Sequence, residues 1–104
     1  MSPTRRRIAK LDRELVELIA RRVDAATAAI RLRTEFGGSV QDEAQEWVVI
    51  DRARTWAEER GISPDVAEAV LAIIMDEGKG RFRAAASARP GSGEESAPAS
   101  AQPG

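Results

Sequence analysis

The sequence predicts an all-α domain of three helices followed by a disordered C-terminal tail. Apolar residues recur at spacings of three and four along residues 8–82, which is the rhythm of helices that bury one face. No segment alternates apolar and polar residues, as a half-exposed strand would, and no internal repeat is present. These observations leave no place for a sheet.

The first helix is expected to begin at Ser2-Pro3 or at Thr4 and to run to Gly37-Gly38. Proline suits the first turn of a helix, and residues 4–36 contain neither glycine nor proline. Such a helix has about 33 residues and is roughly 50 Å long. Because this length exceeds the diameter of a globule of about 80 residues, we expect a homodimer in which the long helices pack against their symmetry mates.

Local capping signals delimit the two shorter helices. The second is expected to begin near residues 40–42, with acidic residues in its first turn, and to end at Gly61. The third is expected to begin at residues 63–65, a Ser-Pro-Asp sequence, and to continue to about Phe82. Two glycines weaken its last turns.

The C-terminal segment, residues 84–104, consists mainly of Ala, Ser, Pro, Gly and Glu and contains no large apolar side chain. It cannot bury enough surface to offset its loss of conformational entropy, so we expect it to be disordered. The folded domain then covers residues 1–83.

Composition excludes several kinds of chemistry. The 104 residues include no Cys and no His, which rules out disulfides, thiolate nucleophiles, histidine general bases and the usual zinc sites. The net charge of −1 argues against nucleic acid as a partner. No apolar run approaches the roughly 20 residues that span a bilayer, and the N-terminus lacks the apolar region of a signal peptide. The expectation is a soluble cytoplasmic protein without metal or cofactor.

Several charged side chains fall on the apolar faces of the predicted helices. At 100° per residue, one sector of the first helix contains Ile8, Leu11, Leu15, Leu18, Ile19, Ala26 and Ile30. Arg22 and Arg33 lie near the middle of this sector, and Arg5 lies on its flank. On the second helix, Asp42 and Glu46 point into the apolar face.

The third helix repeats this feature, because Glu77 and Arg81 continue the face formed by Val66, Val70, Ile73 and Ile74. A buried charge is costly unless it is paired. One interpretation is structural, with salt bridges such as Arg22 to Glu46 or Glu77 to Arg81. For the six charged residues together we favour a polar pocket between three helices. Because guanidinium groups bind carboxylates in a bidentate manner, a carboxylate-bearing small molecule is the expected ligand.

These residues resemble the all-helical class of chorismate mutases over about residues 4–82. The resemblance is carried by Arg5, Ile8, Leu11-Asp12, Leu15, Leu18-Ile19, Arg22, Arg33, Asp42 and Glu46. The third helix matches mainly in its apolar rhythm. The family consists of small intertwined dimers with one long and two shorter helices. The resemblance also implies a role in the shikimate pathway and aromatic amino acid biosynthesis, or in secondary metabolism.

The resemblance also implies roles for individual residues. Arg5 would reach into the partner subunit's site and, with Arg22, hold a substrate carboxylate. Arg33 falls where the family usually has a lysine that contacts a carboxylate and the ether oxygen. Asp42 and Glu46 fall where the family binds the ring hydroxyl, Asp42 partly through its backbone.

Three positions depart from the family pattern. Gln45 stands where many members have an arginine. Arg81 stands where a glutamine or glutamate usually donates to the ether oxygen, and its charge would stabilise negative charge that develops there. Glu77 stands where a small hydroxyl residue lies near the ring substituent. A carboxylate at this position would suit an amino group in place of the hydroxyl, as in 4-amino-4-deoxychorismate.

The first hypothesis is an isomerase that converts chorismate to prephenate by a [3,3]-sigmatropic shift without a covalent intermediate. Arg22, Arg33 and Arg81 would carry most of the catalysis, through substrate positioning and charge stabilisation. Two alternatives keep the fold: a 4-amino-4-deoxychorismate mutase, and an isochorismate-pyruvate lyase, which the segment 54–59 resembles. A third alternative is a non-catalytic helical dimer that serves as a binding module.

Overall fold

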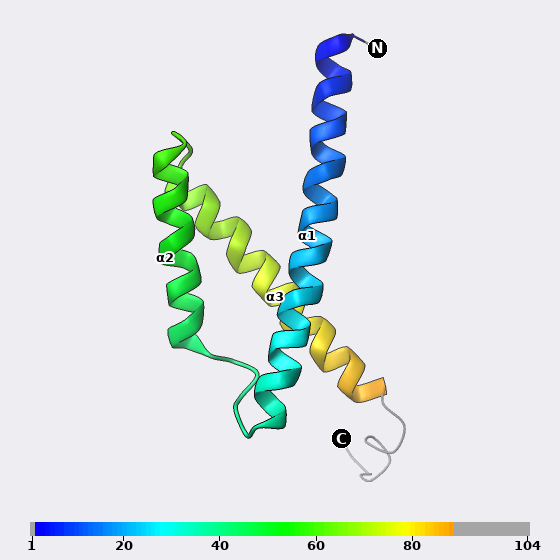
Figure 1. Ribbon diagram of the computed structural model, residues 1–104, viewed down its shortest axis with the longest axis vertical. Coiled ribbons are helices and arrows are strands. Elements are labelled where there is room, and N and C mark those ends of the chain that lie inside the picture. The colour runs from blue at the N-terminus through cyan, green and yellow to red at the C-terminus, as the bar shows by residue number, and fades with distance from the viewer. Residues whose placement is uncertain (1, 89–104) are drawn as a thin grey trace.

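The structure is a computed structural model that describes residues 2–88. It contains three helices, α1 (Pro3–Glu35), α2 (Glu43–Glu59) and α3 (Pro64–Ala88), and no strand within the described residues. Figure 1 shows α1 and α2 standing roughly upright while α3 runs diagonally across α1. The predicted all-α class with one long and two shorter helices is confirmed.

The expected capping residues account for the helix ends. The Ser2 side chain accepts a hydrogen bond from the Arg5 backbone N–H (3.2 Å), which satisfies one of the free donors of the first turn of α1. After α1 and α2 the chain turns through Gly37 (φ 87°) and Gly61 (φ 73°), a left-handed conformation that favours glycine. The Ser63 hydroxyl accepts a hydrogen bond from the Val66 N–H (3.4 Å) at the start of α3.

Helix α3 is longer than the sequence predicts, because it continues to Ala88 rather than ending near Phe82. Three consecutive alanines, residues 84–86, are the strongest helix formers and extend the helix into the segment that was expected to be disordered. Gly78 lies inside the helix and is buried against α1. The remainder of the expected tail, residues 89–104, lies outside the described residues.

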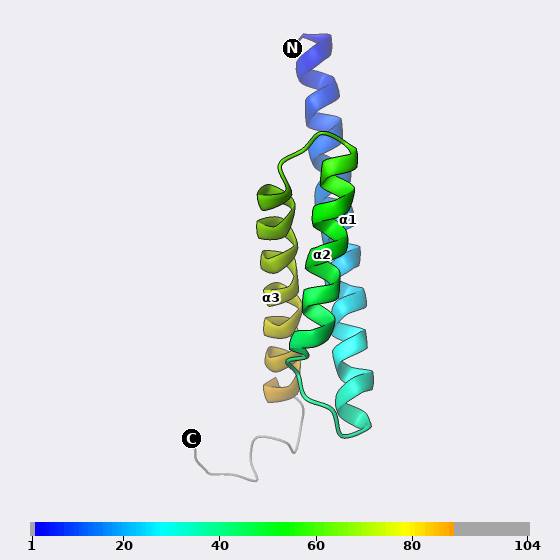
Figure 2. The ribbon, with the colours of Figure 1, turned by 90° about the vertical axis from the view of Figure 1, so that its left-hand side faces the viewer.

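Helix α3 holds the domain together. It packs against both α1 and α2, whereas α1 and α2 do not pack against each other within residues 2–88. Figure 2 shows α1 behind α2, with α3 beside them. The apolar core is small and consists of Val23, Ile30, Ile50, Ala53, Ala57 and Ile74. The space between α1 and α2 is therefore available for a cavity.

Helix α3 contacts α1 by close backbone packing and contacts α2 through charged side chains. At the α1–α3 crossing, Gly78 brings the backbones together: a Cβ added there would lie 3.0 Å from the Cβ of Ala26. Between α2 and α3, Arg54 Nη1 donates to Asp65 Oδ1 (2.9 Å) and to Glu68 Oε1 (2.7 Å). The hydrogen bond to Asp65 and, to a smaller extent, the hydrogen bond to Glu68 raise the pKa of Arg54 above its ordinary value. Arg54 therefore acts as a clamp between two helices.

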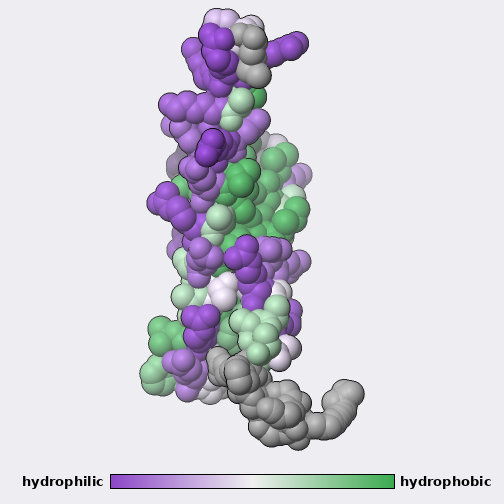
Figure 3. All heavy atoms as spheres, turned by 90° about the vertical axis from the view of Figure 1, so that its right-hand side faces the viewer, coloured by the Kyte–Doolittle hydropathy of each residue, from purple (hydrophilic) through white to green (hydrophobic). Residues whose placement is uncertain are grey.

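The described chain is elongated and leaves a large part of its apolar surface uncovered. Its radius of gyration is 18.1 Å, whereas a compact domain of this length has a value of about 12 Å. Ile8, Leu11, Leu15 and Leu18, on the N-terminal half of α1, are each between 52% and 55% exposed. Figure 3 shows apolar side chains gathered midway along the molecule. Within residues 2–88, no helix contains an apolar stretch long enough to cross a membrane.

Candidate active site

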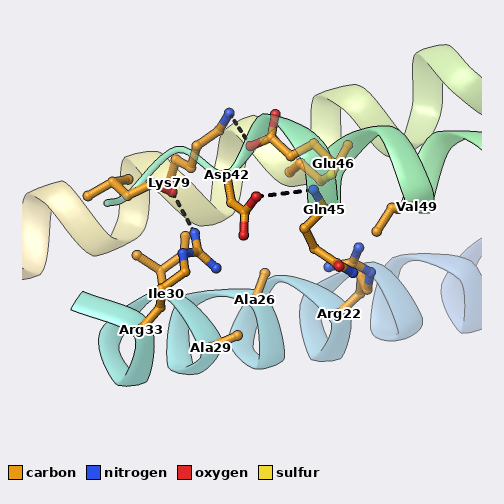
Figure 4. Close-up of a pocket in the computed structure, with 12 residues that line it drawn as sticks. Arg22, Ala26, Ala29, Ile30, Arg33, Asp42, Gln45, Glu46, Val49 and Lys79 are labelled. Atoms are coloured by element: carbon orange, nitrogen blue, oxygen red, sulfur yellow. Dashed lines mark hydrogen bonds and ion pairs between the residues drawn. The ribbon is translucent and has the colours of Figure 1, made fainter. Parts of the chain in front are cut away.

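A cavity of about 170 Å³ lies between α1 and α2, next to the middle of α3. We call it the central cavity. Its apolar lining is formed by Ala26, Ala29, Ile30, Val40, Val49 and Met75, and its polar lining by Arg22, Arg33, Asp42, Gln45, Glu46 and Lys79. The three cationic and two anionic side chains give this lining a net charge of +1. Five of the eight site residues predicted from the sequence therefore meet in one place (Figure 4).

The two arginines of the central cavity project from the same face of α1. They are 11 residues apart, which is about three turns of helix, and both are half-buried. Among residues 2–88, no hydrogen bond or ion pair engages the Arg22 guanidinium. Figure 4 shows Arg22 at one end of the cavity and Arg33 at the other. Arg22 can therefore offer all five of its N–H donors to a ligand.

Arg33 also fastens the loop between α1 and α2. Its Nε donates to the carbonyl oxygen of Ser39 (2.8 Å), and its Nη2 donates to the carbonyl oxygen of Val40 (2.7 Å). Gly38 is pressed against the same side chain, since a Cβ at Gly38 would lie 2.6 Å from Arg33 Cγ. Of the five N–H donors of Arg33, three remain free to meet a ligand.

Asp42 and Gln45 form the first turn of α2 at the cavity wall. Asp42 is the N-cap of α2, and its Oδ1 accepts a hydrogen bond from the Gln45 backbone N–H (3.1 Å). This capping role leaves the second carboxylate oxygen of Asp42 on the cavity side, as Figure 4 shows. The Gln45 side chain lies near Arg22 in the same view. The start of α2 thus supplies an acceptor and an amide to the site.

Glu46 is held by Lys79, a residue that the sequence analysis missed. Lys79 Nζ donates to Glu46 Oε2 (3.0 Å) and to Gln41 Oε1 (3.3 Å), and Gln41 Nε2 donates to the other Glu46 oxygen (3.1 Å). Lys79 is only 7% exposed. The signal that could have revealed it is spacing, because Lys79 lies four residues after Met75 and eight after Leu71, on a second apolar face of the same helix.

Glu77 and Arg81 do not line the central cavity, contrary to the helical-wheel prediction. Arg81 Nη1 lies 3.4 Å from Asp24 Oδ1 on α1, and Arg81 Nε lies 3.6 Å from Glu77 Oε2, with both side chains more than half exposed. The helical-wheel prediction rests on Val66, Val70, Ile73 and Ile74, of which only Ile74 is buried, whereas the other three are 40–69% exposed. Helix α3 has two apolar faces, and Glu77 and Arg81 continue the face that this chain does not cover.

Arg5 does not reach the central cavity of its own chain. It lies in the first turn of α1, 17 residues before Arg22, which corresponds to roughly 25 Å along the helix. Its side chain is exposed. Only a second copy of the chain could bring an Arg5 to this site.

The structural interpretation of the charges predicted two salt bridges, and one of them is present. Glu77 and Arg81 form the i,i+4 pair. Arg22 and Glu46 do not pair, because Glu46 is held by Lys79 instead. The charges of the central cavity are therefore not all consumed by interhelical ion pairs.

Comparison with known proteins identifies the family of this chain. The family model described as chorismate mutase type II matches residues 4–81. The T-protein of Haemophilus influenzae is 33% identical over 73 residues, which cover 70% of this chain and 19% of that relative. The chain thus spans about a fifth of the length of this curated relative. No solved structure matches the chain significantly. With three-quarters of its length matched by the family model and a cavity lined with arginines, the chain belongs to the chorismate mutase type II family, a family of isomerases.

Proposed function

We propose that this chain binds chorismate in the central cavity and catalyses its rearrangement to prephenate. The observation that carries the proposal is the Arg22 guanidinium, which lines the cavity at the end opposite Arg33 and is not engaged by any group in the described part of the chain. A half-buried cation without a protein partner is energetically costly, and a substrate carboxylate would provide the missing ion-pair partner. The apolar wall of the cavity suits the carbon skeleton of a ring.

The chemistry requires positioning and charge stabilisation rather than proton transfer. In the [3,3] shift, the ether C–O bond breaks while a C–C bond forms between the two ends of the substrate. Arg22 would hold a carboxylate, and the free donors of Arg33 would meet a carboxylate and the ether oxygen as negative charge grows there. Asp42, Gln45 and Glu46 would bind the ring side of the substrate. This proposal gives no catalytic role to Arg81, because its partners are Asp24 and Glu77.

The proposed active form is a homodimer. The apolar side chains Ile8, Leu11, Leu15 and Leu18 need a cover that the described chain does not provide, and a second α1 has a matching stripe. Such packing would carry Arg5 of each chain towards the site of the partner subunit. Sedimentation velocity tests this point: the wild type should sediment as a dimer, whereas Leu15→Asp should shift the protein towards the monomer. A monomeric wild type would contradict the proposal.

Two alternative functions on the same fold are no longer supported by the residues that suggested them. The amino analogue of chorismate was suggested by Glu77, which lies outside the central cavity. The isochorismate-pyruvate lyase was suggested by the segment that begins at Arg54, whose guanidinium is engaged by Asp65 and Glu68. Chorismate is therefore the substrate that we propose.

The deciding experiment is incubation of the pure protein with chorismate, isochorismate and 4-amino-4-deoxychorismate in separate reactions, with products identified by mass spectrometry. Prephenate from chorismate is the expected result. Salicylate with pyruvate, or the amino analogue of prephenate, would replace the proposed substrate. No turnover by a folded dimer would favour the non-catalytic binding module.

A thermal-shift measurement separates the binding module from a chain with no ligand site. A stable bicyclic dicarboxylate that mimics the transition state should raise the stability of a functioning site by about 2.7 kcal/mol at a hundredfold excess over its Kd. A site closed by its own salt bridges would gain no stability. Turnover and the thermal shift together therefore distinguish an enzyme, a binding module and an inert helical domain.

A further inference from the structure

Lys79 is the only charged residue that is buried among residues 2–88, and the reaction described above leaves it without a role. It lies on α3, one turn after Met75, and both side chains line the central cavity. A lysine ammonium group loses much of its hydration when it is buried, so its position has to be stabilised by nearby acceptors. These acceptors identify what Lys79 does.

The Lys79 ammonium group and Glu46 form a closed triangle with Gln41. Lys79 Nζ donates to Glu46 Oε2 at 3.0 Å and to Gln41 Oε1 at 3.3 Å. Gln41 Nε2 donates to Glu46 Oε1 at 3.1 Å. Both oxygens of the Glu46 carboxylate are thus fixed by groups from the loop and from α3. Asp76 Oδ1 lies 3.5 Å from Lys79 Nζ on the exposed side.

Two members of the triangle, Glu46 and Lys79, also line a second cavity, which lies between α2 and α3 and which we call the outer cavity. This outer cavity has a volume of about 290 Å³ and is lined by Glu43, Glu46, Trp47, Ile50, Glu68, Ala72, Met75, Asp76 and Lys79. Four of its lining residues are acidic, and Lys79 is the only basic one. Glu46, Met75 and Lys79 line both cavities. Lys79 therefore stands between an acidic surface and the site proposed for a dianion.

We propose that Lys79 is a positioning residue, which neutralises Glu46 and holds its carboxylate against Gln41 so that the central cavity keeps a net positive charge. With Lys79 the charged lining sums to +1, and without it the sum is zero. An unpaired Glu46 would then repel a dianionic ligand at short range, where the low dielectric strengthens the repulsion. This inference rests on the proposed function for its ligand class, although the triangle itself does not.

The test is the affinity of four proteins for the bicyclic dicarboxylate, measured by calorimetry: wild type, Lys79→Met, Glu46→Gln and the double variant. Methionine keeps the length of the side chain and removes the charge. Lys79→Met should bind about 30-fold more weakly than the wild type, because the cavity loses a positive charge and retains an uncompensated carboxylate. In the double variant the net charge returns to +1, and binding should recover at least about fivefold over Lys79→Met.

Matched variants control for folding and for charge. Lys79→Arg keeps the charge and should bind more tightly than Lys79→Met. Asp76→Asn removes the exposed carboxylate near Lys79 and should bind within about twofold of the wild type. Circular dichroism should show an unchanged helical content in each variant. Wild-type affinity in Lys79→Met would overturn the proposal, as would a double variant that binds no better than Lys79→Met.

A second readout distinguishes a failure of this inference from a failure of the proposed function. If the wild type does not bind the dicarboxylate, the proposed function is wrong, and the state of Lys79 is then read by NMR. A buried, ion-paired ammonium group should give a slowly exchanging ¹⁵N–H resonance that disappears in Glu46→Gln and persists in Asp76→Asn. Absence of this resonance in the wild type would overturn the role of Lys79 independently of any ligand.

Discussion

The two halves of α1 carry the same apolar rhythm but differ in what covers them. In the C-terminal half, Val23 and Ile30 are 2% and 5% exposed because α3 crosses the helix there. In the N-terminal half, Leu11 and Leu15 are 55% and 54% exposed. The comparison shows that an apolar stripe predicts that a face will be covered, but does not say whether the cover comes from the same chain.

The charged residues of α1 follow the same division. Arg22 and Arg33 on the C-terminal half line the central cavity of their own chain. Arg5 on the N-terminal half is roughly 25 Å along the helix from that cavity. One half of the helix therefore builds a site, and the other half is expected to complete the site of a partner. Four experiments test this division.

The largest effect is expected for Arg22→Ala. Removing the free guanidinium should lower kcat/KM for chorismate by about 10³-fold, because a cation directed at the substrate is lost from a preorganised site. Turnover can be followed by the loss of chorismate absorbance. Arg21→Ala, which removes the exposed neighbouring arginine, is the matched control and should retain near-normal activity. Comparable activity in Arg22→Ala and the wild type would remove the central cavity from consideration.

The second experiment mixes Arg5→Ala with Arg22→Ala. Each variant alone should be nearly inactive, with kcat/KM lowered by about 10²-fold or more. In a randomly mixed dimer population, half of the dimers contain both chains, and each of these has one intact site, so about a quarter of wild-type activity should return. The mixture is allowed to equilibrate, and its turnover of chorismate is then measured. No recovery, although exchange of chains is demonstrated by mass spectrometry, would show that Arg5 does not act across the dimer.

The third experiment compares the two glycines near the α1–α3 crossing. A Cβ at Gly80 has no neighbour within 4 Å, so Gly80→Ala should raise the free energy of unfolding by about 0.5–1 kcal/mol through helix propensity. A Cβ at Gly78 would lie 3.0 Å from Ala26 Cβ, so Gly78→Ala should lose that gain and cost about 1 kcal/mol. Urea unfolding at fixed protein concentration measures both. Equal effects at the two positions would contradict the close crossing.

The smallest effect is expected for Arg81→Ala. Its ion pairs with Asp24 and Glu77 are exposed, and such pairs contribute little to stability. Activity should remain within about threefold of the wild type, and the free energy of unfolding within about 0.5 kcal/mol. A loss comparable to that of Arg22→Ala would mean that the dimer turns Arg81 towards a substrate, as the family resemblance implied.

Helix starts could be predicted from the sequence because they depend on local chemistry. Ser2, Asp42 and Ser63 accept hydrogen bonds from the first turns of the three helices, and each was marked by residue type alone. The end of α3 could not be predicted in the same way. Glycines inside that helix suggested weakness, but the contact of Gly78 with α1 supplies stabilisation that no local signal contains.

The site was predictable where one face of one helix decided the outcome. Arg22 and Arg33 follow from a spacing of about three turns on α1, and Asp42 and Glu46 follow from one turn on α2. Helix α3 has two apolar faces, and periodicity alone does not rank them. The face that includes Ile74 predicts Arg81 in the site and omits Lys79, which is buried through its contacts with Gln41 and Glu46.

The contact between Gly38 and Arg33 has a consequence for how this sequence can evolve. The two residues are not independent, since the loop fits against the Arg33 side chain only where position 38 lacks a Cβ. Replacing Arg33 would remove the contact with its side chain, although a Cβ at position 38 would still lie 3.0 Å from the carbonyl oxygen of residue 33. A Cβ gained first at position 38 would displace the arginine side chain. The order of substitutions therefore matters, and glycine at position 38 should persist for as long as arginine does at position 33.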